Sequence, residues 1–377
     1  MNTKRMRLRG IGVWLAALLS SWSVGAMATG YNMTKGVTEV SEEIYDLHML
    51  ILAISLIIAA GVYGVMIWSI IHHRKSKGHQ PVPFHENTTL EITWTIVPLV
   101  ILVVMAVPAT KAMVHIYDTK DADITIKVTG YQWKWEYEYM GQGVKFFSNL
   151  STPQEQMKGQ AEKGEHYLYE VDNPLVLPVG KKVRFLFTAK DVLHAWWVPV
   201  FGWKQDAVPG FINENWAQIK EAGTYRGSCT ELCGRGHGYM PIVVEAKSEA
   251  EYGAWLKAKK SAAAALDKAA KTTLTKADLM KKGQEVYKAN CAPCHQEDGK
   301  GITGTFPAIA DGKIAKSGKI ADHIDLVLKG KAAMPPFGEG LKDVEIAAVI
   351  TYERNAFGNN TGDLVQPKDI IAARGKK

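Results

Sequence analysis

Two cysteines, a histidine and a methionine lie close together near the middle of the sequence, in a stretch rich in glycine. Their spacing is C-x3-C-x3-H-x2-M, formed by Cys229, Cys233, His237 and Met240, and His194 lies upstream of them. Thiolate, imidazole and thioether ligands together select copper over magnesium, calcium or manganese. A mononuclear copper site of the blue type uses one thiolate, so one cysteine is left over. Two thiolates can bridge two copper ions, and the spacing therefore indicates a two-copper site.

A disulfide between Cys229 and Cys233 is the alternative interpretation in an oxidising compartment. A disulfide leaves His194, His237 and Met240 without a role. The metal site accounts for all five residues, so the pattern favours metal binding.

A second motif, Cys291-Ala-Pro-Cys294-His295, has the C-x-x-C-H spacing of covalent haem attachment. The two cysteines form thioethers with the vinyl groups, and the histidine comes to lie under the iron. A thioredoxin-like C-x-x-C is the alternative, but no βαβ pattern flanks this one. Met334, beside two prolines, is the expected second iron ligand, because methionine with histidine raises the haem potential. All four cysteines of the chain are then assigned.

The composition excludes several classes of protein. The chain has 377 residues, which suggests two or three domains, and 47% of them are hydrophobic, which is too many for a disordered chain. Four cysteines are too few for a disulfide scaffold. The net charge of +7 comes from the N-terminal region, a linker and a tail, while the candidate globular parts are close to neutral. A nucleic-acid partner is therefore not expected.

The beginning of the chain predicts export and insertion into a membrane. Residues 1–28 combine a basic stretch, a short apolar run and an A-x-A site, as in a cleaved signal peptide. Residues 29–117 contain two apolar segments, expected as helices over about 47–71 and 92–116, that are long enough to cross a bilayer. Basic residues in the connecting loop place it in the cytoplasm and both outer ends outside. The histidines of this loop lack ligand spacing, so a solvated loop is favoured over a metal site.

Beyond the second apolar segment the pattern changes from helix to strand and back. Residues 118–248 alternate apolar and polar side chains between turn signals, which predicts an all-β sandwich or small barrel. Residues 249–275 are rich in alanine and lysine and are expected to form a semi-rigid, solvated linker. Residues 276–357 predict a helical domain, and 358–377 are expected to be a C-terminal tail.

The motifs together resemble a known family. The copper loop, the string YQWKWEY at 131–137 and the segment EITWTIVP at 91–98 resemble subunit II of cytochrome c oxidase, over residues from about 40 to 248. Residues 276–357 resemble class I cytochromes c, as in caa-type oxidases whose subunit II carries a fused cytochrome. The resemblance implies a multidomain membrane protein. Its parts are a two-helix transmembrane hairpin, an all-β cupredoxin Greek-key barrel with a binuclear CuA centre, and an all-α class I cytochrome c domain.

The resemblance also implies roles for single residues. The copper ligands it implies are His194, Cys229, Cys233, His237, Met240 and the main-chain carbonyl of Glu231. The Glu231 carboxylate matches a residue that faces a magnesium or manganese ion shared with subunit I. Trp133 matches the aromatic residue at which electrons enter the copper site. Glu91 matches a carboxylate at the entrance of a proton path, although a carboxylate at a helix N-terminus also suits the helix dipole.

Other positions are expected to be structural or depart from the family. Trp135 and Tyr137 are expected to pack in the sheet, and His323 is expected at the surface. Tyr131 and Phe211 stand where the family usually has histidine and arginine, and neither position is a copper ligand.

In class I cytochromes c, which residues 276–357 resemble, the first and last helices cross. This resemblance implies that Tyr352 meets Gly283 and Tyr287.

The resemblance implies the electron-entry subunit of a haem–copper terminal oxidase. Electrons from a cytochrome c or a cytochrome bc complex would enter at haem c, pass to CuA and reach the haem of subunit I, where oxygen is reduced to water with proton pumping. The implied partners are subunits I and III. The implied location is the bacterial inner membrane, with both redox domains on the periplasmic side.

Two alternatives stay open at this point. A quinol-oxidase-type structural subunit has the same fold but should lack the copper ligands. A CuA-type reductase of another substrate, such as soluble nitrous oxide reductase, should lack the membrane hairpin.

Overall fold

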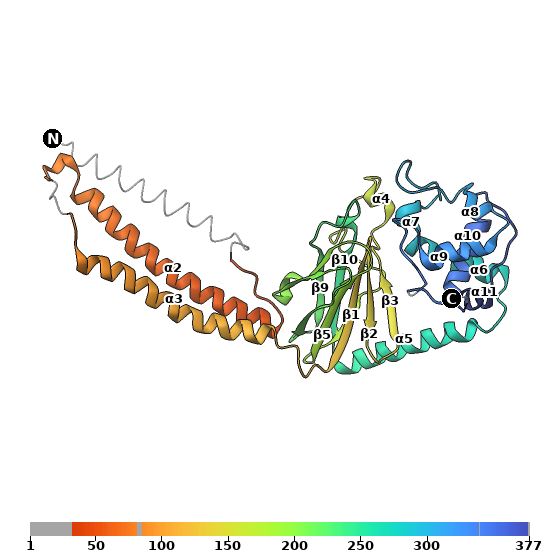
Figure 1. Cartoon of the computed structure of the whole chain (residues 1–377), viewed down its shortest axis with the longest axis horizontal. Coiled ribbons are helices and arrows are strands. Elements are labelled where there is room, and N and C mark those ends of the chain that lie inside the picture. The colour runs from red at the N-terminus through yellow and green to blue at the C-terminus, as the bar shows by residue number, and fades with distance from the viewer. Residues whose placement is uncertain (1–31, 81–84, 339, 376–377) are drawn as a thin grey trace. The chain divides into compact units, whose positions relative to one another are not determined.

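The computed structural model describes residues 32–80, 85–338 and 340–375 (Figure 1). The expected signal peptide, residues 1–28, lies outside the described residues. The chain divides into two compact units. The first comprises Met1–Gly36 and Glu43–Met105, and the second comprises Val37–Glu42 and Ala106–Lys377.

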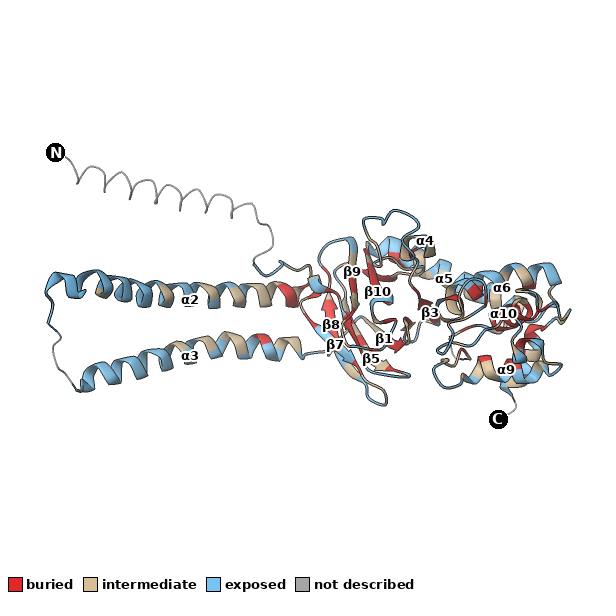
Figure 2. Ribbon diagram, turned by 90° about the horizontal axis from the view of Figure 1, so that it is seen from above, coloured by how far each residue is buried: buried red, intermediate tan, exposed pale blue. Residues whose placement is uncertain are grey.

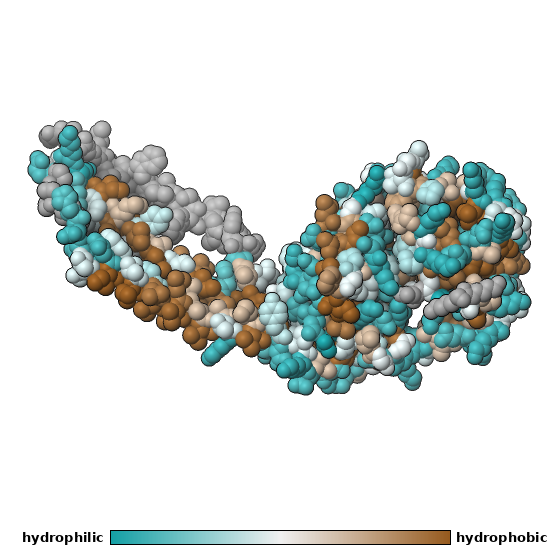
Figure 3. Space-filling model, viewed as in Figure 1, coloured by the Kyte–Doolittle hydropathy of each residue, from teal (hydrophilic) through white to brown (hydrophobic). Residues whose placement is uncertain are grey.

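The first unit contains the greater part of two long apolar helices, α2 (Glu39–His72) and α3 (Thr88–Ile116). Asn87 caps α3, because its Oδ1 accepts a hydrogen bond from the Leu90 N–H at 3.1 Å. The most apolar windows of the helices have mean hydropathies of 2.6 and 2.3, and none of either window is buried. Their exposed apolar surface is the brown band of Figure 3. Both helices are therefore long and apolar enough to cross a membrane, as expected.

The second unit begins with a β domain of two five-stranded sheets. One sheet has the order β3-β2-β1-β5-β8 and the other β4-β10-β9-β6-β7. The β1–β5 and β4–β10 pairs are parallel, and the other pairs are antiparallel. The strands are β1 (Ile124–Tyr131), β2 (Lys134–Tyr139), β3 (Val144–Ser148), β4 (Leu175–Pro178), β5 (Lys182–Ala189), β6 (His194–Trp197), β7 (Lys204–Ala207), β8 (Asn213–Gln218), β9 (Gly223–Cys229) and β10 (Pro241–Lys247).

Aromatic side chains are buried between the sheets, and Figure 2 shows the buried parts of the strands in red. In β5, residues with inward side chains alternate with half-buried ones, so Phe185 and Phe187 both reach the core. Both rings contact Trp196, at centroid distances of 5.6 and 5.8 Å. Trp135 and Tyr137 are fully buried, as expected for residues that pack in the sheet. Burial of a phenylalanine side chain stabilises a fold by about 2 kcal/mol, so this core holds the strands that carry the candidate site.

The expected linker is largely one helix, α5 (Glu249–Ala269), which a capping box at Ser248 begins. Near its start, the Trp255 ring lies 5.2 Å from that of Tyr139 and 6.3 Å from that of Phe146. The first part of α5 is therefore packed on the β domain, whereas most of the alanines and lysines that follow are exposed or half-buried.

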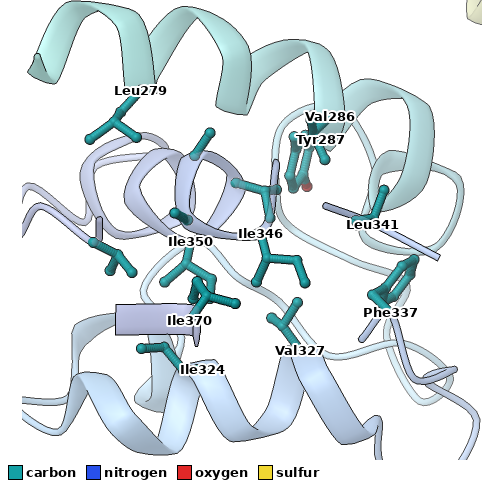
Figure 4. Packing of buried hydrophobic residues seen from close by; sticks show 14 of the residues in the cluster. Leu279, Val286, Tyr287, Ile324, Val327, Phe337, Leu341, Ile346, Ile350 and Ile370 are labelled. Carbon is teal, nitrogen blue, oxygen red and sulfur yellow. The ribbon is translucent and has the colours of Figure 1, made fainter. Parts of the chain in front are cut away.

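The helical domain follows α5, and Figure 4 shows its core. Its helices are α6 (Lys276–Asn290), α7 (Ala292–His295), α8 (Lys313–Lys316), α9 (Ile320–Lys329), α10 (Asp343–Asn355) and α11 (Pro367–Arg374). A Cβ at Gly283 of α6 would overlap the Ala348 carbonyl of α10, so glycine permits the close crossing of these helices. The Tyr287 and Tyr352 rings lie 5.6 Å apart at this crossing, as the family resemblance implied.

The helical domain differs from two expectations. His323 is only 4% exposed, because its Nε2 lies 2.9 Å from Oε2 of Glu353 on α10. The expected tail contains α11, and Val365 and Ile370 belong to the buried core. The domain therefore continues beyond residue 357 into the segment expected as a tail.

Candidate functional site

Three strands bring the candidate copper ligands together. Cys229 is the last residue of β9, and Met240 comes directly before β10, to which β9 is paired. The connecting loop contains Cys233 and His237, and Gly234 in this loop has a φ of +106°. His194 begins β6, which pairs with β9 beside Cys229. The short spacing along the loop brings Cys229, Cys233, His237 and Met240 together, and the pairing of β6 with β9 adds His194. All five side chains therefore lie at one end of the second sheet.

The ligand atoms lie close together. The Sγ atoms of Cys229 and Cys233 are 3.8 Å apart, and Cys229 Sγ lies 3.9 Å from His194 Nδ1. Cys233 Sγ lies 3.6 Å from His237 Nδ1 and 3.6 Å from Met240 Sδ. Each cysteine sulfur therefore has one histidine nitrogen near it, and these side chains together form a soft donor set that could hold copper.

The two cysteines are free thiols, and each is almost fully buried. Their mutual hydrogen bond lowers the pKa of Cys229 and raises that of Cys233. The carbonyl of Glu231 faces the same cluster, since Cys229 Sγ lies 3.4 Å from this oxygen. The donor set is soft and withdrawn from water, so it fits copper.

Asp191, for which no role was predicted from the sequence, orients His194. Its Oδ1 lies 2.9 Å from Nε2 of His194, which leaves Nδ1 directed at Cys229. Burial acts to lower the pKa of His194. Its hydrogen bonds with Asp191 and Cys229 act in the opposite direction, and together they raise the pKa above its usual value. A Cβ at Gly130 would lie 2.8 Å from the His194 ring, so glycine is needed on β1. A carboxylate three residues before a ligand histidine is the sequence signal for such an orienting residue.

Trp133 lies against the copper loop. Its Nε1 donates a hydrogen bond to the Cys233 carbonyl at 3.0 Å, and a Cβ at Gly236 would overlap its ring. Gln132 donates to the same carbonyl at 2.8 Å. Trp133 is half-buried, and its ring is 6.1 Å from that of Phe306, in the helical domain. It therefore links the copper loop to the helical domain.

The haem motif lies at the end of α6 and in α7. Cys291 and Cys294 are free and half-buried, and His295 Nδ1 lies 2.8 Å from the Pro307 carbonyl. That bond leaves Nε2 of His295 as the nitrogen able to bind iron. Met334 follows α9, and both Met334 and Cys291 pack against the same apolar core. The motif and the expected second ligand are therefore parts of one domain, and they fit a covalent haem.

Neither Glu91 nor the Glu231 carboxylate takes part in these contacts. Glu91 is exposed in the first turn of α3, where its Oε1 accepts a hydrogen bond from the Asn87 N–H at 3.5 Å. Glu231 is half-buried within the copper loop, between Cys229 and Cys233.

Three parts of the chain match known protein families. Residues 124–247 match the family described as cytochrome C oxidase subunit II, periplasmic domain, and residues 26–112 match its transmembrane domain. The chain belongs to the cytochrome c oxidase subunit II family. Residues 278–352 match a different family, described as cytochrome C oxidase, cbb3-type, subunit III. This subunit II therefore carries a C-terminal cytochrome c domain, and the two domain families imply copper and haem c as cofactors.

Curated relatives agree with this membership. The chain is 39% identical to the probable cytochrome c oxidase subunit 2 of Rickettsia bellii over 225 residues, which are 60% of this chain and 82% of the relative. It is 36% identical to cytochrome c oxidase subunit 2 of Cereibacter sphaeroides, over 60% of this chain and 79% of the relative. Among solved structures, the periplasmic domain of cytochrome oxidase subunit II from Bradyrhizobium japonicum is 38% identical, with a TM-score of 0.34. The match covers 38% of this chain and 97% of that one.

Proposed function

We propose that this subunit II is the electron-entry subunit of a haem–copper terminal oxidase in the bacterial inner membrane. The observation that carries the proposal is the presence of a complete soft-ligand cluster and a C-x-x-C-H motif on one chain. When bound, the copper pair and the haem supply carriers for single electrons. Electrons from a cytochrome c or a cytochrome bc complex would enter at the helical domain, cross to the copper loop and leave toward the haem of subunit I.

The chain's own residues would hold and separate these carriers. His194, Cys229, Cys233, His237 and Met240 would hold the copper pair, with the Glu231 carbonyl as a further ligand. Burial of the cluster excludes water, and ligands already in place need little rearrangement when an electron arrives. Trp133, hydrogen-bonded to the copper loop, gives electrons an entry point.

The membrane arrangement follows from charge. Arg74, Lys75 and Lys77 lie between α2 and α3, and these charges support a cytoplasmic loop with both redox domains on the periplasmic side. We propose subunits I and III as partners, and a magnesium or manganese ion shared with subunit I through Glu231. Residues 1–28 would be removed on export, and residues 118–248, 249–275 and those from 276 onward would be the copper domain, linker and cytochrome domain.

The complete ligand cluster favours this function over a quinol-oxidase-type subunit. The test is oxygen uptake by the purified oxidase with two reductants, a reduced soluble cytochrome c and a quinol. We expect uptake with cytochrome c, with the haem of this subunit reduced before the copper pair. Uptake with quinol alone, without turnover of this haem, would overturn the proposal.

Met334→Ala is expected to lower the reduction potential of haem c while the copper signal stays unchanged, because a thioether ligand favours ferrous iron. The measurement is a redox titration of the haem absorption in the oxidase. Met280→Ala, on α6, is the matched control. An unchanged potential in the Met334 variant would remove Met334 from the iron site.

Glu91→Gln is expected to slow oxygen reduction without slowing reduction of the copper pair, because the amide cannot pass on a proton. The measurements are steady-state oxygen uptake and the rate of copper reduction in the same preparation. Glu86→Gln, in the exposed loop before α3, is the control. Normal uptake in the Glu91 variant would leave this carboxylate as a helix-end residue only.

A further inference from the structure

A lysine ammonium is buried between the β domain and the helical domain. Lys134, the first residue of β2, is only 4% exposed. Its Nζ lies 4.1 Å from the ring centroid of Phe147 on β3 and 4.1 Å from that of Phe337 in the helical domain. It also lies 3.4 Å from Oδ1 of Asn290, at the end of α6. Buried lysines are rare, and the negative faces of two aromatic rings stabilise this cation.

The surrounding contact is closely packed on both sides. The Phe147 and Phe337 rings lie 6.4 Å apart, and both residues are 5% exposed. A Cβ at Gly340 of the helical domain would overlap the Phe147 ring and lie 3.0 Å from Oε1 of Glu136. The need for glycine at this position therefore comes from the neighbouring domain.

Lys134 also lies on a short route between the two candidate redox sites. Its neighbour in sequence, Trp133, donates a hydrogen bond to the Cys233 carbonyl of the copper loop. Asn290, which Lys134 contacts, directly precedes Cys291 of the haem motif. Two adjacent residues of the β domain therefore contact the copper loop on one side and the haem segment on the other.

We propose that Lys134 is a positioning residue, which seats the cytochrome domain on the copper domain so that the haem segment is held beside Trp133. This inference rests on the proposed function, because it concerns electron transfer between the two domains. With both groups bound, one electron would pass from the reduced haem to the oxidised copper pair, and no bond would be made or broken. Lys134 is not a carrier; it fixes the distance across which the electron passes.

The charges around Lys134 agree with this role. Burial lowers the pKa of Lys134 to about 8, while Cys291, Cys294, Glu136 and Asp172 act to raise it. The ammonium therefore stays largely protonated at neutral pH. Burial raises the pKa of Glu136, whose Oε2 lies 3.2 Å from Nζ of Lys145. A negative charge at position 134 would meet two ring faces and the Glu136 carboxyl, all of them unfavourable neighbours.

The test is Lys134→Glu in the full chain within the assembled oxidase. After rapid photoreduction of haem c, the rate of copper reduction is measured in a single turnover. We expect a decrease of about tenfold or more, because small errors in position slow reactions between fixed groups strongly. The linker keeps the domains together, so transfer is slowed and not abolished. Lys134→Arg, which keeps the cation over the rings, should restore most of the rate.

Two further variants separate docking from folding. Gly340→Leu changes no charge but should push the domains apart, and we expect a similar decrease in rate. Lys281→Glu, at an exposed position of α6, is the matched control and should have the rate of the unmodified chain. Hydrogen–deuterium exchange of residues 144–148 should rise in Lys134→Glu and Gly340→Leu, while the haem and copper spectra stay unchanged.

Electron transfer in the unmodified chain tests the proposed function, and the rates of the variants test the role of Lys134. If the unmodified chain passes no electron from haem to copper, the proposed function fails. If it does so, and both Lys134→Glu and Gly340→Leu transfer at the unmodified rate, only the role of Lys134 and its contact is overturned. A rate lowered in both variants, with exchange raised at 144–148, supports the proposal.

Discussion

Cys229→Ser is expected to abolish the two-copper centre and leave the covalent haem intact. The remaining residues, His194, His237, Cys233 and Met240, are the donor set of a mononuclear blue-copper site. We therefore expect at most about one copper per chain in this variant, with the unpaired electron confined to one nucleus. Electron paramagnetic resonance and a copper-to-haem ratio on the purified oxidase measure both quantities.

Ser228→Ala is the matched control, because Ser228 precedes Cys229 on β9 and is only half-buried. It should keep the two-copper signal. If Cys229→Ser also kept two coppers sharing one electron, the two thiolates could not be the bridging ligands, and the assignment of the cluster would be wrong.

Trp133→Phe is expected to slow electron delivery to the copper pair on the order of 10- to 100-fold. Phenylalanine lacks the N–H that donates to the Cys233 carbonyl, so both the route into the copper loop and the position of the ring are lost. The measurement is the rate of copper reduction after photoreduction of haem c.

Trp255→Phe controls for the loss of an indole, because Trp255 packs on Tyr139 and Phe146 at the start of α5. It should transfer electrons at the rate of the unmodified chain. The electron paramagnetic resonance of the copper pair must be unchanged in Trp133→Phe. A slow rate in that variant then reflects loss of the electron route and not damage to the copper site. A normal rate in Trp133→Phe would show that electrons enter the copper loop elsewhere.

The sequence predicted which candidate copper ligands cluster, because most of them are close together along the chain. Cys229, Cys233, His237 and Met240 lie on one loop, so their spacing alone brings them together. The same holds for the haem motif at the end of α6. The apolar segments predicted both long helices, although α2 begins at Glu39, well before residue 47. Polar first turns carry no hydropathy signal, so hydropathy places such a start too late.

The sequence could not predict contacts between distant polar residues. His323 was expected at the surface because its partner, Glu353, lies on another helix and no local pattern connects them. Burial of Lys134 likewise depends on Phe147 and Phe337, which belong to different domains.

A second failure concerns the end of the chain. The segment after residue 357 contains too few apolar residues to predict a packed helix. The structure nevertheless buries Val365 and Ile370 against the helical core.

This subunit is proposed to hold a two-copper centre and a covalent haem on one chain, and its metal content and copper resonance decide whether it does. The full chain, purified in its oxidase, is analysed for copper and haem and examined by electron paramagnetic resonance. We predict that this subunit holds two coppers and one covalent haem, with one unpaired electron shared equally by two copper nuclei. A covalent haem without copper in this subunit would contradict the account and favour a quinol-oxidase-type subunit that carries a cytochrome.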